Sequence, residues 1–391
     1  MTLHTICHRP IDSSPVIVRW RHDSPVAGRY ETSTGVVLIQ HGDLVGGVSE
    51  GVEVVLVDTG AVRTLLLPGR GMSIWKIWAD EKEFGWTSPV SGPVHPALVP
   101  VTDPSGLGWL EGFDELVVRC GLESNGAPEF NADKGLAYSL HGRIANTPAQ
   151  NLRVVVNEQT DSVEVIGDVI ESKLFFKRLR LCARIGFHAS LPTVSIVDEV
   201  TNDRATSATM QLLYHINVGE PVLSNGSKLF FNFGDLAPKD SLSAGEINTW
   251  NDGGPPSSGY AERVYFTTPA ASDSHWATAV LASGDQATGL CVRFDTRTLP
   301  YFIVWKNFAA TQDGYVMGLE PATNFPNTRS FEQDHGRVVE LQAGETKTFR
   351  VDVCPLTTVE EVQMLKADLE LRQPVSGAMV HREPKAGWSD V

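Results

Sequence analysis

The feature that most constrains the fold of this 391-residue chain is a series of short segments in which apolar and polar residues alternate. Such segments recur over 52–67, 151–170, 173–216, 276–320 and 337–353. Alternate side chains of a β-strand point to opposite faces, so these segments predict strands with one buried face. The 35 glycines and 23 prolines are typical of the many turns that short strands need. Because no helical pattern alternates with the strands, we predict an all-β fold, either one large antiparallel sandwich or two sheet layers.

One helix is predicted, close to the C-terminus. Thr358 followed by Glu361 is a capping-box signature, and apolar residues then recur at helical spacing as far as Leu371. Just before it, segments 337–342 and 346–353 flank a Gly turn and are expected to form a hairpin.

We expect three parts along the chain. Residues 1–44 are expected to form an N-terminal extension with edge strands, and residues 45–372 a sandwich domain. Residues 373–391 are expected to form a loose, polar C-terminal tail.

The charge and hydropathy of the chain exclude several kinds of partner. Asp and Glu number 47 against 32 Lys and Arg, which gives a net charge of −15. Nucleic acids and anionic membranes attract basic surfaces, so neither is an expected partner. No stretch is apolar for long enough to span a bilayer, and the first residues lack the apolar core of a signal peptide. We therefore expect a cytoplasmic protein, as a monomer or homodimer.

Residues 85–148 differ from the rest of the chain, being rich in Gly, Pro, Trp and His and having little periodicity. Long irregular loops of this kind often cover a site. Trp109 is one of several aromatic residues here whose rings could stack on the C–H faces of a sugar. Packing of the loop onto the sheet would explain each ring equally well.

Three strings place ionisable residues in unusual settings. His215 and Asn217 lie on the polar face of a strand whose other face is apolar. Glu320 ends an apolar strand, where burial would raise its pKa towards that of a useful base. His141 lies in a Gly-flanked turn with Arg143 two residues later, and both could hold the oxygens of a sugar. Each also has an ordinary interpretation: a surface histidine, a solvated glutamate, or an arginine paired with a carboxylate.

Two further cations are candidates for substrate binding. Arg70 lies in a loop between two glycines and could face a substrate or simply serve the turn. Lys306 ends a strand, where a solvated tip is the usual role. No metal site is predicted, because no close-spaced ligand pair such as HxH or HExxH accompanies the histidines. The chain also lacks the GxSxG, Walker and GxGxxG motifs.

Taken in order, His141, His215 and Glu320 resemble the aldose 1-epimerase (galactose mutarotase) superfamily, in spacing (215 − 141 = 74 and 320 − 215 = 105) as well as in type. More closely, the chain resembles a branch of epimerase-like proteins of undefined substrate. The strings that carry this resemblance span about residues 45–355: Gly69-Arg70-Gly71-Met72, Gly108-Trp109-Leu110-Glu111-Gly112-Phe113-Asp114, Cys120-Gly121-Leu122, Leu140-His141-Gly142-Arg143-Ile144, Leu213-Tyr214-His215-Ile216-Asn217 and Gly318-Leu319-Glu320-Pro321-Ala322. Arg143 and Ile216 depart from the usual pattern, in which a small residue and an aromatic stand at those positions.

The resemblance implies a large β-supersandwich and mutarotase chemistry without a metal or organic cofactor. By family role, Glu320 would take the proton of the anomeric hydroxyl, His215 would protonate the ring oxygen and His141 would hold the sugar. The partner would be a small-molecule sugar. Arg143, Arg70, Asn217, Trp109 and Lys306 are the further candidates for binding it, from their settings in the sequence.

Two alternatives stay open. Another sugar enzyme on the same fold, such as a lyase, a hydrolase or an epimerase of sugar phosphates or uronates, would use Arg70 and Arg143 to bind phosphate or carboxylate. A non-catalytic sugar-binding protein would need only aromatic rings and hydrogen-bond donors.

Overall fold

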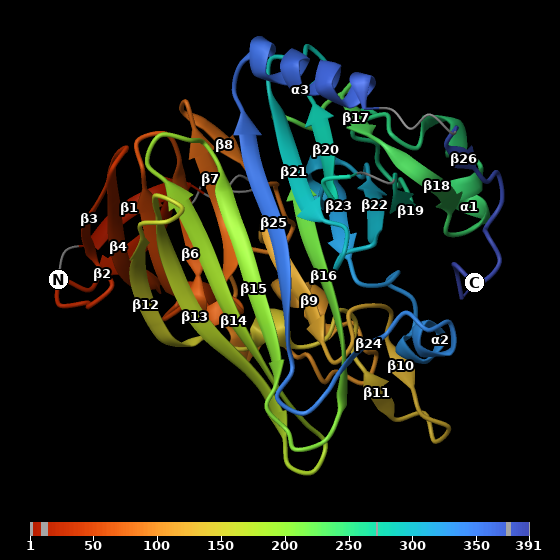
Figure 1. Cartoon of the computed structure of the whole chain (residues 1–391), viewed down its shortest axis with the longest axis horizontal. Helices are drawn as coiled ribbons and strands as arrows, with labels where there is room; N and C mark the ends of the chain where they lie inside the picture. The colour runs from red at the N-terminus through yellow and green to blue at the C-terminus, as the bar shows by residue number, and fades with distance from the viewer. Residues whose placement is uncertain (1–2, 9–14, 271–272, 373–376, 391) are drawn as a thin grey trace.

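The computed structural model describes residues 3–8, 15–270, 273–372 and 377–390. Strands make up 47% of it and helices 12%, which confirms the all-β prediction. Two large sheets lie face to face (Figure 1), and their strands pair antiparallel except for one short parallel pair, β18 with β26. None of the helices within these ranges has both the length and the apolar character needed to cross a membrane.

The larger sheet has 16 strands, and β6-β7-β9-β16-β23-β22-β19-β18 follow one another through its middle. Its members are β1 (Leu3–His8), β2 (Pro15–Trp20), β3 (Gly28–Thr32), β4 (Gly35–Val45), β5 (Glu53–Asp58), β6 (Arg63–Leu67), β7 (Ser73–Ala79), β8 (Lys82–Phe84), β9 (Val117–Leu122), β16 (Ala208–Val218), β18 (Phe233–Pro238), β19 (Arg263–Pro269), β22 (Tyr301–Asn307), β23 (Val316–Ala322), β24 (Val339–Leu341) and β26 (Met379–Val380). Strand β9 lies inside the segment 85–148, whose sequence shows little periodicity.

The smaller sheet has eight strands in the order β12-β13-β14-β15-β25-β21-β20-β17. These are β12 (Gln150–Asn157), β13 (Ser162–Lys173), β14 (Lys177–His188), β15 (Val194–Asn202), β17 (Lys228–Phe231), β20 (Trp276–Ala282), β21 (Gly289–Asp295) and β25 (Thr346–Leu356). Apart from short 3-10 helices, the remaining elements are the β10 (Glu129–Phe130) and β11 (Leu136–Tyr138) pair and the helices α1 (Ser241–Ala244), α2 (Arg329–Asp334) and α3 (Val359–Leu371).

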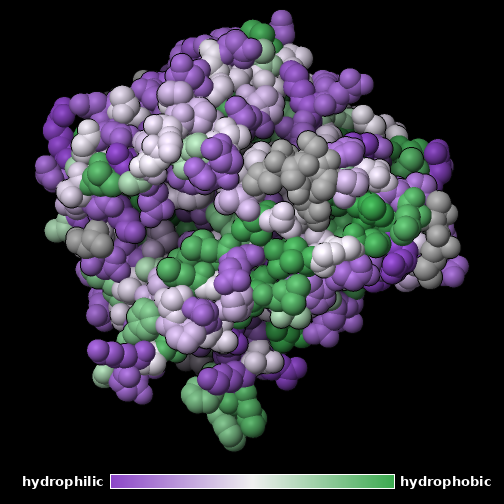
Figure 2. Space-filling model, turned by 180° about the vertical axis from the view of Figure 1, so that it is seen from behind, coloured by the Kyte–Doolittle hydropathy of each residue, from purple (hydrophilic) through white to green (hydrophobic). Residues whose placement is uncertain are grey.

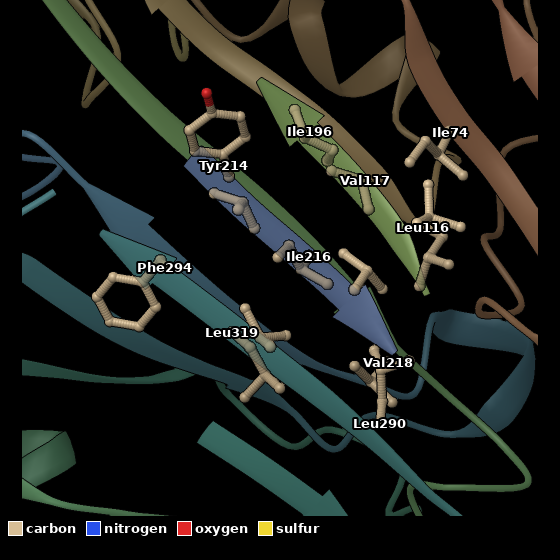
Figure 3. Packing of buried hydrophobic residues seen from close by; sticks show 14 of the residues in the cluster. Ile74, Leu116, Val117, Ile196, Tyr214, Ile216, Val218, Leu290, Phe294 and Leu319 are labelled. Carbon is tan, nitrogen blue, oxygen red and sulfur yellow. The ribbon is translucent and has the colours of Figure 1, made fainter. Parts of the chain in front are cut away.

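The main core fills the space between the two sheets. Tyr214 and Ile216 of β16 and Leu319 of β23 face Ile196 and Phe294 of the smaller sheet (Figure 3). These positions follow the period-two pattern of the sequence, because each strand buries alternate residues. Burial of this apolar surface is the main force that holds the two sheets together.

Helix α3 has the start that the sequence predicts. The Thr358 hydroxyl accepts a hydrogen bond from the backbone N–H of Glu361, and the Glu361 carboxylate accepts one from the N–H of Thr358. Val362 and Leu369 bury this helix against the ends of β20 and β21. The capping box is confirmed, and α3 is the longest helix among the described residues.

The expected hairpin around Gly344 is wrong. Strand β24 pairs with β16 of the larger sheet, whereas β25 pairs with β15 and β21 of the smaller one. The turn therefore carries the chain from one sheet to the other. The residues of such a turn resemble those of a hairpin turn, so the local sequence does not distinguish the two.

The described part of the C-terminal segment, 377–390, is anchored rather than loose. Met379–Val380 pairs with β18, and the Trp388 ring lies 4.8 Å from that of Phe325. Asn327 Nδ2 also donates to the carbonyl of Trp388 at 2.9 Å. This segment thus packs on the larger sheet, on the side away from the main core.

Candidate active site

Strand β16 separates two environments. Its even-numbered residues, including Tyr214 and Ile216, lie in the main core. Its odd-numbered residues, including Leu213 and His215, point to the other side of the larger sheet. That side carries a second apolar cluster, which we call the outer cluster: Trp86, Trp109, Phe113, Val118, Cys120, Ala145, Leu213, Val264, Phe266, Ile303, Val316, Ala322 and Phe325.

Figure 2 shows the molecule from behind, with hydrophobic residues gathered near the middle of that side and hydrophilic ones around them. Residues 85–148 supply Trp86, Trp109 and Phe113 to the outer cluster. The irregular segment therefore covers the outer face of the central strands, as its composition suggested.

The register of β16 and β23 brings His215 and Glu320 together. Leu213 pairs with Ala322 and Asn217 with Gly318, so His215, midway between them, lies opposite Glu320. His215 Nε2 is 3.2 Å from Glu320 Oε1. The two atoms are not aligned as a hydrogen bond, and neither Glu320 Oε1 nor His215 Nδ1 has a hydrogen-bond partner.

Both side chains are nevertheless buried, with exposed fractions of 5% for His215 and 2% for Glu320. Gly318 makes room for them: a Cβ there would lie 2.5 Å from Glu320 Oε1 and 3.2 Å from His215 Cε1. The pair thus combines burial with unused hydrogen-bonding atoms, which is uncommon in structural polar groups.

His141 joins the pair from a tight turn. Its φ is +56° and that of Gly142 is +72°; a Cβ on Gly142 would collide with the carbonyls of Ser124 and Gly121. The His141 ring centroid lies 5.6 Å from that of His215. His141 Nδ1 lies 2.8 Å from the Asn125 carbonyl oxygen, which only accepts, so Nδ1 carries the proton and Nε2 is left as a free acceptor.

Aromatic rings surround the two histidines. The centroid of Trp109 is 4.6 Å from that of His141, and those of Phe113 and Trp305 are 5.0 and 5.2 Å from that of His215. Trp109 Nε1 is buried without a partner. The site therefore offers apolar ring faces beside unused polar atoms, the combination that carbohydrate recognition requires.

Burial opposes charge on all three ionisable groups. It lowers the pKa of His141 to about 4 and holds that of His215 well below 6.5. It raises the pKa of Glu320 well above 4.5, and the carboxylate of Glu262 raises it further. Over the pH range between the two shifted values, His215 and Glu320 together hold one proton and no net charge.

Arg70 is not a substrate-facing residue, which corrects one of our expectations. It is 1% exposed, and its Nε binds Glu115 at 2.7 Å. Its terminal nitrogens donate to the carbonyls of Val94 and Gly112 and to Asn146 Oδ1. The guanidinium therefore fastens the covering segment to the sheet and has little capacity left for a ligand.

Lys306 also faces away from the site. Its neighbour Trp305 points outwards, so Lys306 points into the main core, where Nζ lies 4.9 Å from the centroid of the Phe308 ring. Nζ donates to the Thr249 carbonyl at 2.9 Å, and burial lowers the pKa of Lys306 to about 8. We therefore withdraw Lys306 as a sugar-binding residue.

Arg143 and Asn217 have different positions. Arg143 is exposed and lines a separate cavity of about 140 Å³ together with Tyr138, Glu171 and Lys177. Asn217 is fully buried; its Nδ2 donates to the Glu115 carbonyl at 2.9 Å, while its Oδ1 has no partner. The structure thus brings Asn217 and Trp109 next to the His141–His215–Glu320 group, but not Arg143.

Sequence reasoning missed three residues on this face. Trp305 contacts His215, and its Nε1 donates to Glu262 at 2.7 Å. Glu262 and Lys239 are the charged side chains whose fields act on Glu320. The alternation of β22 could have revealed Trp305, whereas Glu262 and Lys239 depend on the register of several strands. Among the described residues, no three His, Cys, Asp or Glu side chains are grouped to hold a metal ion.

Comparisons with known proteins show which family and fold this chain shares. The family described as "Domain of unknown function (DUF4432)" matches residues 49–354. A candidate aldose 1-epimerase from Klebsiella pneumoniae is 27% identical, with a TM-score of 0.86 over 98% of this chain and 99% of its own. The comparison with curated proteins gives no match.

More distant structures share the fold alone. A galactose mutarotase-like protein from Clostridium acetobutylicum is 12% identical, with a TM-score of 0.56 over 82% of this chain and 99% of its own. Galactose 1-epimerase from Lactobacillus acidophilus is 11% identical, with a TM-score of 0.52 over the same shares. The chain therefore belongs to the DUF4432 family, an epimerase-like branch of the aldose 1-epimerase (galactose mutarotase) superfamily with an undefined substrate.

Proposed function

We propose that this protein is an aldose 1-epimerase, which interconverts the anomers of a sugar by opening and closing its ring. The observation that carries the proposal is the buried His215–Glu320 pair, opposed across two strands with unused hydrogen-bonding atoms. Ring opening needs one group that takes a proton and another that gives one, both at the same C–O unit. A carboxyl and an imidazole that share a single proton meet this need.

The reaction balances with these two groups alone. Glu320 takes the proton of the anomeric hydroxyl, whose electrons form the C1=O bond. The C1–O5 bond breaks, and the ring oxygen takes the proton of His215. Rotation about C1–C2 and closure with the roles reversed give the other anomer.

The resting pair holds its proton in the uncharged form, because burial disfavours a carboxylate and an imidazolium. The reactive, ionised form requires this proton to cross from Glu320 to His215, over the 3.2 Å between Oε1 and Nε2. The hydroxyls of a bound sugar would supply the hydrogen bonds that the charged form lacks in the empty site.

His141 and the aromatic rings would position the sugar. The free Nε2 of His141 can accept a hydroxyl proton, and Trp109 Nε1 can donate to a sugar oxygen. These contacts would place the anomeric carbon beside His215 and Glu320, so that the bound sugar is already oriented for proton transfer.

The test is the rate at which an isolated anomer reaches equilibrium, followed by polarimetry or NMR over a panel of neutral and acidic pyranoses. We expect the protein to accelerate it for at least one sugar, and His215→Asn to lower turnover at least ~100-fold, the usual scale for a positioned acid. His188→Asn is the matched control, since His188 is a half-buried strand residue of the other sheet. Full activity of His215→Asn, or no acceleration for any sugar, would refute the proposal.

A further inference from the structure

Lys239 lies on the same outer face as the candidate catalytic pair. Its backbone N–H donates to the carbonyl of Val264, which continues the pairing of β18 with β19. Val264 pairs with Trp305, and Trp305 pairs with Gly318. Directly opposed residues of antiparallel strands point to the same face, so Lys239 belongs to the row of side chains that contains Trp305.

The row beside it contains the reacting groups. Glu320 pairs with Ile303, and Ile303 with Phe266. Strand β18 is three strand spacings from β23, or about 14 Å between backbones. Both side chains stand on the same face of the sheet, with two strands between them.

The ammonium of Lys239 has no ion-pair partner among the described residues. The acidic residues close to it along the chain and in the neighbouring strands are otherwise engaged. Asp240 caps helix α1 through the N–H of Ser243, Glu262 accepts from Trp305 Nε1, and Asp235 binds Lys385. Lys239 is half-buried, and a half-buried cation without a counter-ion is able to pair with a bound anion.

The charge of Lys239 acts on both sides of the site. It lowers the pKa of Glu320 and also that of His141. The influence of a charge falls with distance, so the ammonium lies close enough to both groups for its field to act on them.

We propose that Lys239 makes this site selective for sugars that carry an anionic group, a carboxylate or a phosphate, on the exocyclic carbon C6. The placing of the anomeric carbon at His215 and Glu320 rests on the proposed function. The net charge of −15 repels anions from the molecule as a whole, so selection of an acidic sugar needs a local cation. Arg70 and Arg143, the cations that the sequence suggested for this role, lie elsewhere.

The experiment measures binding by isothermal titration calorimetry, which does not depend on turnover. The probes are glucose and galactose, their uronic acids and their 6-phosphates, titrated into the full chain and into Lys239→Gln. We expect at least one acidic sugar to bind at least ten times more tightly than its neutral parent. Lys239→Gln should abolish that preference and leave the affinity for the neutral sugar within twofold. The uronate and phosphate arms separate the two sources of charge.

Lys347→Gln is the matched control, because Lys347 is a half-buried lysine of β25 in the other sheet, and it should retain the preference. Equal binding of neutral and acidic sugars, no binding of any acidic probe, or an unchanged preference in Lys239→Gln would each overturn the inference. Selective binding that depends on Lys239 without faster anomer exchange would uphold the inference and refute the proposed function instead.

Discussion

Strand β16 has buried ionisable groups at both of its faces, and the two faces differ in how those groups are satisfied. On the inner face, Tyr214 donates to Asp198 at 2.8 Å. Arg119 of β9 binds the same carboxylate through two nitrogens, at 2.5 and 2.9 Å, and also donates to the Met72 carbonyl at 2.7 Å. This cluster of charges is closed, because both carboxylate oxygens and the guanidinium are hydrogen-bonded.

On the outer face, one residue further along β16, the hydrogen-bonding atoms of His215 and Glu320 are not all satisfied. We call this pair open. Both are nearly as deeply buried as the inner cluster, yet each keeps an atom without a hydrogen-bond partner. A buried polar group without partners costs stability, whereas a closed network fixes the structure. We infer that the inner cluster stabilises the sandwich, and that the outer pair is kept for a ligand to complete.

The largest expected effect is on the inner face. Arg119→Met leaves the Asp198 carboxylate buried without its cation, and this should lower the free energy of unfolding by about 3–5 kcal/mol. Urea unfolding measures it. Arg153→Met is the control, because Arg153 is 42% exposed and lies 3.6 Å from Asp168; it should cost less than about 1 kcal/mol. Similar losses of unfolding free energy in the two variants would contradict the claim that the buried, fully hydrogen-bonded charges stabilise the fold more than a solvated pair does.

The second-largest effect tests the geometry of the His215–Glu320 pair on the outer face. The methyl group of Gly318→Ala would lie 2.5 Å from Glu320 Oε1 and push the carboxyl out of position. We expect a 10- to 100-fold loss of turnover, in keeping with the sensitivity of catalysis to small displacements. The control is Gly186→Ala on the smaller sheet, where the nearest atom to a new Cβ is 3.7 Å away. Unchanged turnover in Gly318→Ala would show that the geometry of the pair is unimportant.

A third prediction concerns pH. The folded-state pKa of Glu320 is raised above its unfolded value of 4.5, so the stability it contributes is present below pH 4.5 and is lost as pH rises towards the folded pKa. Glu320→Gln lacks this loss. Its stability relative to the natural chain should therefore increase between pH 5 and pH 8, by about 1 kcal/mol or more. Unfolding in urea at several pH values measures the difference.

The exposed Glu158 supplies the control for this measurement, as Glu158→Gln should give a curve parallel to that of the natural chain. A parallel curve for Glu320→Gln would mean that the outer carboxyl is solvated or paired, against our interpretation.

The smallest effect is expected at His141. Asn tolerates the positive φ of this turn, so His141→Asn should keep the fold while losing the imidazole that accepts a sugar hydroxyl. We expect KM to rise about tenfold with a smaller change in kcat, the result of losing a binding contact. Steady-state kinetics of anomer exchange separate the two constants, and a fall in kcat alone would assign His141 to the chemical step instead.

Much of the fold and the centre of the site can be predicted from alternation. Along β16 and β23 a period of two assigns each residue to a face, and it places His215 and Glu320 on the outer one. The same rule applied to β22 would have turned Lys306 inwards, since its neighbour Trp305 faces out. That error came from treating a strand end as solvated without counting positions.

Other features depend on contacts that no local pattern encodes. Arg70 is buried because Glu115 and two loop carbonyls surround it, and a Gly-flanked loop alone does not reveal those neighbours. Lys239 reaches the site only through the register of four strands. Strand β24 joins the larger sheet by pairing with β16, which lies more than a hundred residues earlier in the chain. No local pattern encodes such a long-range contact.

The most direct test of the central claim compares two neighbouring groups on opposite faces of the sheet: Tyr214→Phe on the inner face and Glu320→Gln on the outer. For each, the rate of anomer exchange per folded molecule is measured alongside the free energy of unfolding at pH 7. Our account predicts that Tyr214→Phe loses about 1 kcal/mol of stability and keeps full turnover. Glu320→Gln should lose no stability but at least about 99% of turnover. Full turnover in Glu320→Gln, or a loss in Tyr214→Phe as large as that in Glu320→Gln, would contradict it.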